Sequence, residues 1–337
     1  MKHALILIAL CAACVEPVTE SEVSQGLRCP TWGCGTNSPT VGDGFLFDEL
    51  DASGVTPNRG GVRIVKAWAS DGRGVSLRVE RHSLIATAFD GSRIYTGDAV
   101  IGMVIRLHHD TYGDYELLIE NVQLQALTFW AGTAEAVPAY TIKSRKVGEL
   151  SFKEYACKYD VLAADPRWTG VEHAAIMFQG DRYDPDAKTV YETPSTDPWF
   201  NLACAATAPA KMHLMRHTRA GSFLASGSMA YDTTIKERTA MLKMFTADYC
   251  GTGKSFTVDG QPLVYDDSNH WYRDATGYST QEALWSSEGA ICLDDPPRLY
   301  TKREVDAACG RVLPACGDFR AWWYPWTSRA HVMSANR

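Results

Sequence analysis

Eight cysteines beyond the N-terminal segment constrain the fold of this chain more than any other feature. They stand at Cys29, Cys34, Cys157, Cys204, Cys250, Cys292, Cys309 and Cys316. An even number of cysteines in an exported chain is typical of a disulfide framework, because thiols oxidise outside the cytoplasm. Sequence spacing favours two local bridges, and the other four cysteines must then pair over longer loops. The expected pairs are Cys29–Cys34, Cys309–Cys316, Cys157–Cys204 and Cys250–Cys292.

The N-terminus indicates export. Residues 4–13 form an apolar run that is too short to span a bilayer and is typical of a signal peptide. The run ends in two alanines directly before Cys14. This order resembles the bacterial lipoprotein signal, although Cys11 stands where such signals usually have leucine. We expect a signal peptide at residues 1–13 and a lipid on Cys14 that anchors the chain to a membrane of the cell envelope, the outer membrane being favoured. An ordinary secretory peptide cleaved nearby is the alternative, and it implies a secreted protein.

Charge and composition indicate which partners the chain can bind and what its two terminal segments form. The net charge of the 337 residues is −7, whereas proteins that bind nucleic acids present basic surfaces. We therefore expect no nucleic-acid partner.

Residues 15–40 are polar and then turn-rich, which predicts a tether followed by a small cysteine knot. Residues 301–337 are rich in cysteine and tryptophan. Their aromatic run at 322–326 could stack on sugars if exposed, but we favour burial because two cysteines anchor the segment upstream.

Residues 41–150 are predicted to form a β-rich domain. β-branched and aromatic residues recur there in six short runs that turn residues separate. The runs lie at residues 62–68, 75–81, 83–89, 99–108, 115–124 and 140–143. In the second run Val75, Leu77 and Val79 alternate with polar residues, as expected for a strand with one buried face. A small sandwich or barrel is the natural architecture for such strands.

Helical patterns join the strands beyond residue 150. Residues 232–249 form the clearest helix, with Asp232 or Thr233 as its N-cap. A second helix is expected within residues 200–217, and a hairpin with an Asp-Gly turn within residues 256–265. The expected fold class is α+β, with an N-terminal all-β small sandwich or barrel followed by a disulfide-stapled α+β domain.

One motif closes the predicted helix and suggests a family. Residues 242–267 (LKMFTADYCGTGKSFTVDGQPLVYDD) contain Ala247, Asp248, Tyr249 and Cys250 in sequence. This stretch, with FNLAC before it and GAIC after it, resembles the ADYC domain of exported bacterial proteins. The resemblance covers residues 151–300 and implies no established activity. The family's pattern has two further cysteines near Met212 and Met241, and both positions are methionine here.

The motif itself has a structural interpretation. Tyr249 lies on the apolar stripe of the predicted helix, so we expect a buried ring and a paired hydroxyl group. Asp248 lies at the edge of that stripe, and we expect it to accept hydrogen bonds from nearby backbone or from an arginine. Cys250 follows a helix C-terminus, where the helix dipole disfavours a thiolate. A disulfide is therefore favoured over a nucleophile.

No established catalytic, metal or cofactor motif is complete in this sequence. Residues 251–255 (GTGKS) resemble the end of a phosphate-binding loop, but the order is helix then strand, the reverse of what that loop requires. His213 and His217 are spaced as in a zinc protease helix, but Leu214 stands where the catalytic glutamate should follow the first histidine. No metal and no cofactor are expected.

Two function classes remain open. The first is a non-enzymatic lipoprotein of the cell envelope that has a binding or structural role toward an envelope polymer or a protein partner. The alternative is an extracellular hydrolase that acts on envelope polymer. The weak candidates for acid–base residues in such a hydrolase are Asp248, His213, His217 and His270. A concave pocket in which histidines and carboxylates converge would favour the enzyme.

Overall fold

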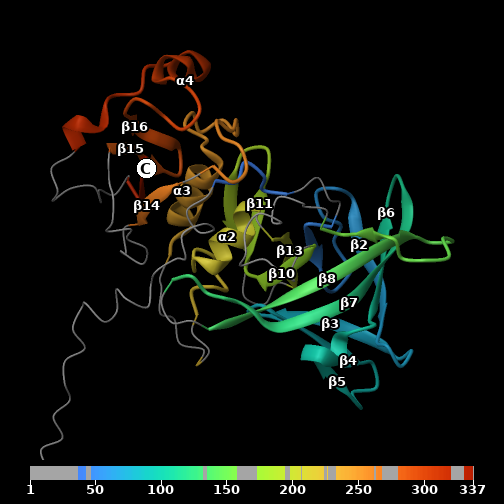
Figure 1. Cartoon of the computed structure of the whole chain (residues 1–337). Helices are drawn as coiled ribbons and strands as arrows, with labels where there is room; N and C mark the ends of the chain where they lie inside the picture. The colour runs from blue at the N-terminus through green and yellow to red at the C-terminus, as the bar shows by residue number, and fades with distance from the viewer. Residues whose placement is uncertain are drawn as a thin grey trace, which may run out of the picture.

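The structure is a computed structural model of the whole chain (Figure 1). It describes residues 37–42, 47–131, 135–157, 173–193, 198–205, 207–223, 226, 233–261, 263–267, 280–319 and 330–336. The predictions for Cys14, Cys29, Cys34, His270 and the aromatic run at 322–326 lie outside these residues. No helix among the described residues has the length and apolar character needed to cross a membrane.

One large sheet dominates the molecule (Figure 1). Its eleven strands among the described residues are β1 (Glu49–Asp51), β2 (Val62–Trp68), β3 (Gly74–Glu80), β4 (Ser83–Ala88), β5 (Ile94–Thr96), β6 (Val104–His109), β7 (Gly113–Thr128), β8 (Ala136–Lys146), β9 (Glu154–Tyr155), β10 (Ala174–Gln179) and β13 (Trp199–Cys204). The strand order is β1-β13-β10-β8-β7-β6-β2-β3-β4-β5, with β9 beside β8. All the pairings are antiparallel.

The sheet bends over its own apolar face. Contacts join β1 to β2, and β10 to β3 and β4, although these strands are not hydrogen-bonded neighbours. Register shifts in the long pair of β7 and β8, which bulges produce, accompany this bending. The enclosed core contains the inward side chains of the sheet, such as Leu77, Leu107 and Leu117. The six predicted β runs all overlap strands, but the sheet continues to residue 204, so the small sandwich or barrel is not confirmed in that form.

The second part of the molecule contains the helices. Among the described residues these are α2 (Ala208–Leu214), α3 (Ile235–Thr246) and α4 (Lys302–Cys309), together with the 3₁₀ turn η4 (Cys316–Phe319); a further 3₁₀ turn, η1 (Gly97–Val100), lies beside the strands of the large sheet. A hairpin of β11 (Asp181–Asp184) and β12 (Thr189–Glu192) packs on α3. A four-stranded sheet has the order β14 (Val264–Asp267), β17 (Val332–Asn336), β15 (Thr280–Ser286) and β16 (Gly289–Leu293). The expected α+β class is confirmed.

Strand β10 separates two cores. Ala175 and Met177 point into the core of the bent sheet, whereas Ile176 and Phe178 belong to a second core with α2, α3 and the small sheet. A strand that is buried on both faces has a continuous apolar sequence, which periodicity cannot distinguish from a buried helix. The same reason explains one error. Residues 200–204 are predicted within a helix at 200–217, but they belong to β13, and only α2 is helical there.

Two further predictions need correction. Helix α3 begins after Thr234, whose hydroxyl forms a capping box with Glu237, and not after residue 232 or 233. Ile235 is 41% exposed, so it does not belong to the buried stripe. Residues 256–265 do not form a hairpin, because β14 pairs with β17 at the far end of the chain. A strand's partner depends on the return of distant segments, which a local turn signal does not report.

The candidate functional site at the ADYC motif

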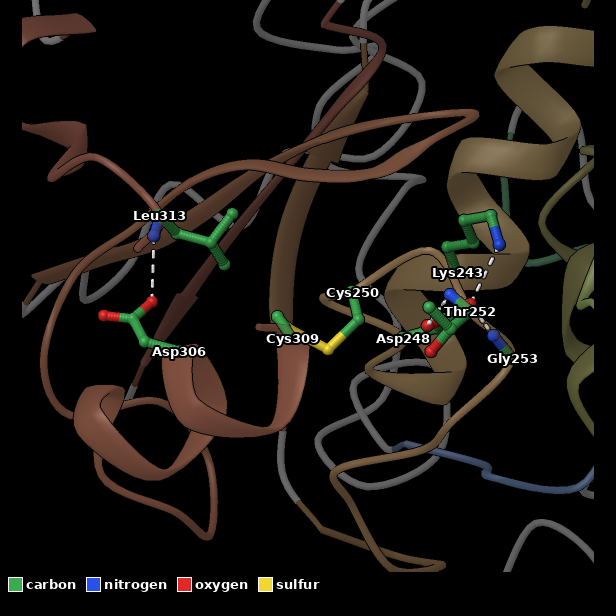
Figure 2. Close-up of a disulfide and its surroundings, with 8 residues drawn as sticks. All are labelled: Lys243, Asp248, Cys250, Thr252, Gly253, Asp306, Cys309 and Leu313. Carbon is green, nitrogen blue, oxygen red and sulfur yellow. Dashed lines mark hydrogen bonds and ion pairs between the residues drawn. A yellow bond between two sulfur atoms is a disulfide. The ribbon is translucent and has the colours of Figure 1, made fainter. Parts of the chain in front are cut away.

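The motif forms the end of helix α3 and the sharp turn after it. Ala247 adopts the left-handed conformation at φ 50°, and this conformation ends the helix. The fully buried carboxylate of Asp248 then accepts hydrogen bonds from the backbone N–H groups of Thr252, at 3.0 Å, and Gly253, at 2.8 Å. Its oxygen Oδ2 also lies 2.8 Å from the Nζ of the buried Lys243 (Figure 2). The expected role of Asp248 in holding this turn through backbone hydrogen bonds is therefore present.

Tyr249 lies in the interior with its hydroxyl group paired. Its ring is fully buried and stacks on Trp285 at a centroid distance of 5.0 Å. The hydroxyl donates to the buried carboxylate of Glu282, which Arg298 binds through Nε at 2.9 Å. Burial, and secondly the charge of Glu282, raises the pKa of Tyr249 well above its ordinary value. The phenol therefore stays protonated and serves as a hydrogen-bond donor. The expected buried ring and paired hydroxyl are confirmed.

The disulfides connect the motif to α4. Cys250 pairs with Cys309, with Cα atoms 5.0 Å apart, so the bridge joins the motif to the last residue of α4 (Figure 2). Cys292 pairs with Cys316 at the same Cα separation. A capping box at Thr301 starts α4, and Asp306 accepts a hydrogen bond from the N–H of Leu313, at 2.9 Å, in the following loop.

These bridges correct two of the expected pairs. The Cys250–Cys292 and Cys309–Cys316 pairings are wrong, because α4 directs Cys309 toward the motif and the next loop brings Cys316 to β16. The pair Cys157–Cys204 is confirmed, with Cα atoms 5.3 Å apart in the core of the bent sheet. Sequence spacing failed for the other two because the positions of α4 and of the loop after it, and not the distance along the chain, decide which cysteines meet.

The two histidines proposed from their spacing do not share a site. His213 lies on α2, fully buried between Phe178 and Phe129, and its Nδ1 is 2.9 Å from the hydroxyl of Thr218. Burial, and secondly the charge on nearby His82, lowers the pKa of His213 well below its ordinary value.

His217 lies beyond the end of α2. Its Nε2 is 3.1 Å from the carboxylate of Asp267 on β14, and both side chains are buried. Neither this imidazole nor that of His213 hydrogen-bonds Asp248. The described residues thus give no convergence of the proposed acid–base groups.

The geometry can be compared with known proteins. A family model for the ADYC domain matches residues 97–299 of the chain. The chain belongs to the ADYC domain family. No curated protein and no solved structure matches it. The family match begins inside the bent sheet, so the ADYC domain includes strands from both sides of residue 150.

The two methionines at positions where the resemblance implies cysteines lie in the interior of this ADYC protein. Met212 on α2 and Met241 on α3 are both fully buried in the second core, where the two helices contact each other. Methionine is an adaptable apolar side chain, so it suits such positions.

Several residues of the ADYC protein's site were not identified from its sequence. Three charged residues are buried around the motif: Lys188, Glu282 and Arg298. A single charged residue in a sequence gives no local pattern from which its burial could be predicted. Ser255 stood in a motif that was rejected as a phosphate loop. In the described residues no cluster of three or more histidine, cysteine or carboxylate side chains is arranged to hold a metal ion.

Proposed function

We propose that this ADYC protein is an exported lipoprotein of the cell envelope, anchored through Cys14, with a binding or structural role. The proposal rests on the burial of the family motif, whose side chains bind other groups inside the protein and not a ligand at its surface. Asp248 and Tyr249 are fully buried and paired inside the protein, and Cys250 is oxidised. A motif engaged in this way stabilises a fold, and disulfides are typical of exported chains because thiols oxidise outside the cytoplasm.

A surface groove next to the motif supports a binding role. It has a volume of about 430 Å³, within the range of ligand sites. Its walls come from the start of α3, the β15–β16 turn and the loop after α4. The groove is lined by Lys236, Arg311, His331, Glu288, Ile291 and Val312, among others. Lysine and arginine outnumber the one carboxylate there, and Val312 is 80% exposed. We propose that the groove accepts an anionic part of an envelope polymer or protein partner.

Lipid attachment is tested at the N-terminus of the protein expressed in a bacterial host. We expect the wild type to enter the detergent phase in Triton X-114 partitioning, and mass spectrometry to find acyl chains on Cys14. Cys14→Ala should remove both properties, whereas Cys11→Leu should keep them because leucine suits that position of the signal. A wild-type protein that stays in the aqueous phase with an unmodified N-terminus would refute the anchor.

Binding in the groove is tested with purified peptidoglycan sacculi, a polymer rich in carboxylates. We expect co-sedimentation of the wild type and a clear loss with Arg311→Glu. The control is Arg303→Glu, which makes the same charge change on an exposed residue of α4 outside the groove. Equal sedimentation of all three proteins would refute an anionic polymer as the ligand of this groove.

The alternative function is an extracellular hydrolase. The buried, paired state of His213, His217 and Asp248 gives it no support through those residues. A different pair of side chains, Lys188 and Ser255, favours it.

A further inference from the structure

A buried lysine contacts a serine beside the ADYC motif. Lys188 lies in the turn between β11 and β12, and its side chain is almost completely enclosed, at 6% exposure. Its Nζ is hydrogen-bonded to the hydroxyl group of Ser255, in the loop that follows the motif. Ser255 is partly exposed. A serine hydroxyl near the surface thus meets an amine that water does not reach freely.

The surroundings hold this contact from both sides. The Nζ of Lys243 donates to the carbonyl of Ala187, at 3.0 Å, and fixes the turn that carries Lys188. Gly253 has φ +86°, and a Cβ there would collide with the carbonyl oxygen of Asp186 in the same turn. Only glycine therefore allows the serine loop to approach the lysine turn so closely. Lys188 itself has a left-handed backbone, at φ 51°, which is costly for a residue with a side chain.

The charges around the pair favour a neutral amine. The one carboxylate in this cluster, Asp248, is already bound by Lys243 and by two backbone N–H groups. Lys188 has no carboxylate within ion-pair distance among the described residues; besides Ser255 it reaches the carbonyl of Pro39, at 3.4 Å. Burial is the main cause that lowers the pKa of Lys188; Lys243 lowers it further, and Asp248 opposes the shift. A neutral amine can accept a proton from a hydroxyl group.

We propose that Ser255 and Lys188 form a nucleophile and general base for acyl transfer from a carboxylic ester or amide. The oxygen of Ser255 attacks the carbonyl carbon while its proton moves to the Nζ of Lys188. The carbon–oxygen bond of an acyl-serine forms, and the leaving alcohol or amine departs with the proton from the lysine. Water then cleaves the acyl-serine, with Lys188 again taking and returning a proton, and the products are the free carboxylic acid and Ser255.

A donor for the developing oxyanion lies at the nucleophile itself. The backbone N–H group of Ser255 has no acceptor among the described residues. The N–H of a nucleophilic serine is one of the usual donors to a tetrahedral intermediate. The site thus combines a nucleophile, a base and a free donor. It is independent of the lipid anchor and of the groove proposed above.

The test uses a biotinylated fluorophosphonate on the full oxidised protein. The serine oxygen forms a bond to phosphorus, fluoride leaves, and the serine proton moves to the lysine. We expect mass spectrometry to locate the adduct on Ser255, and labelling to disappear in Ser255→Ala. Lys188→Arg keeps hydrogen-bond donors at this position, but its guanidinium stays protonated and cannot act as a base in this pH range. We expect this variant to be labelled about 100-fold more slowly than the wild type. Lys254→Gln, on the exposed neighbour, should be labelled like the wild type.

The pH profile gives a second measurement on the wild type, which does not depend on any variant folding. Labelling should reach half its maximum at a pH below 10.5, the ordinary pKa of lysine, because the amine must be neutral. A folded wild type that stays unlabelled at Ser255 would overturn the proposal. Equal labelling of Lys188→Arg, or a half-maximum at or above pH 10.5, would also overturn it. None of these results bears on sedimentation with sacculi or on lipid attachment, so this inference and the proposed function fail separately.

Discussion

The bent sheet and the motif region are stabilised in different ways. The core of the sheet consists of apolar side chains from many strands, together with the Cys157–Cys204 bridge. The motif region also contains ion pairs whose two side chains are both buried, Lys243 with Asp248 and Glu282 with Arg298, whereas the arginines that bind Glu116 in the sheet are partly exposed. The stabilisation that apolar burial gives is divided among many weak contacts. The stabilisation that a buried ion pair gives is lost when one of its two partners is removed. The comparison indicates that single substitutions damage the motif region more readily than the sheet.

The largest effect should come from removing the bridge between the motif and α4. The double variant Cys250→Ala, Cys309→Ala opens a loop with a sequence separation of 59 residues. We expect it to lower the free energy of unfolding by about 4 kcal/mol, against about 3 kcal/mol for Cys292→Ala, Cys316→Ala. The second loop is shorter, with a separation of 24 residues. Urea unfolding of the three proteins measures both differences. If the first variant loses less than about 1 kcal/mol in the free energy of unfolding, the Cys250–Cys309 disulfide is not needed for the stability of the motif region.

Breaking the buried ion pair of the motif should have the next largest effect. Lys243→Met leaves the carboxylate of Asp248 buried with only its backbone donors. We expect a loss of about 3 kcal/mol in the free energy of unfolding. Lys254→Met is the matched control, because this lysine is exposed on the same loop, and it should change stability by less than about 0.5 kcal/mol. Similar losses for both variants would contradict the contrast between the two regions.

The boundary between the two regions should be sensitive to acid. His82, in the turn between β3 and β4, faces His213 of α2 at a ring distance of 5.7 Å, and both rings contact Phe129. Burial is the main cause that lowers the pKa of His82 to about 4, with Arg81 and Arg216 acting in the same direction and Glu135 opposing them. Both histidines are therefore neutral in the folded protein at neutral pH.

The sign of the pH effect follows from these directions. Between pH 6.5 and about 4 the unfolded chain binds protons at both histidines and the folded chain does not, so stability falls with falling pH. The slope should approach about 1.4 kcal/mol per pH unit for each histidine. Denaturant unfolding at pH 7, 6 and 5 measures it. His82→Asn should remove one histidine's share of the slope. If the dependence of the free energy of unfolding on pH is the same in His82→Asn as in the wild type, His82 does not contribute to the acid sensitivity.

Local patterns predicted local structure well. The alternation in Val75, Leu77 and Val79 marks one face of β3, because a strand repeats every two residues whatever lies around it. The predicted burial of Tyr249 is confirmed, but the helical stripe is not its cause, because α3 ends at Thr246 and not at residue 249, and Tyr249 lies in the turn after it. The two faces of β13 could not be predicted, because the burial of its second face depends on α2 and on the rest of the second core.

The sequence by itself determined six strands of the bent sheet (β2, β3, β4, β6, β7 and β8), the existence of α3 and the structural use of the ADYC motif. These features follow from side-chain periodicity and backbone preferences within about twenty residues. Tertiary structure alone decided which cysteines pair, that β14 joins β17, and that Lys188 meets Ser255 across a sequence separation of 67 residues. Such contacts form only after the chain has returned on itself. The packing of whole helices and strands decides which residues form these contacts, and the sequence of a short segment does not indicate how those elements pack.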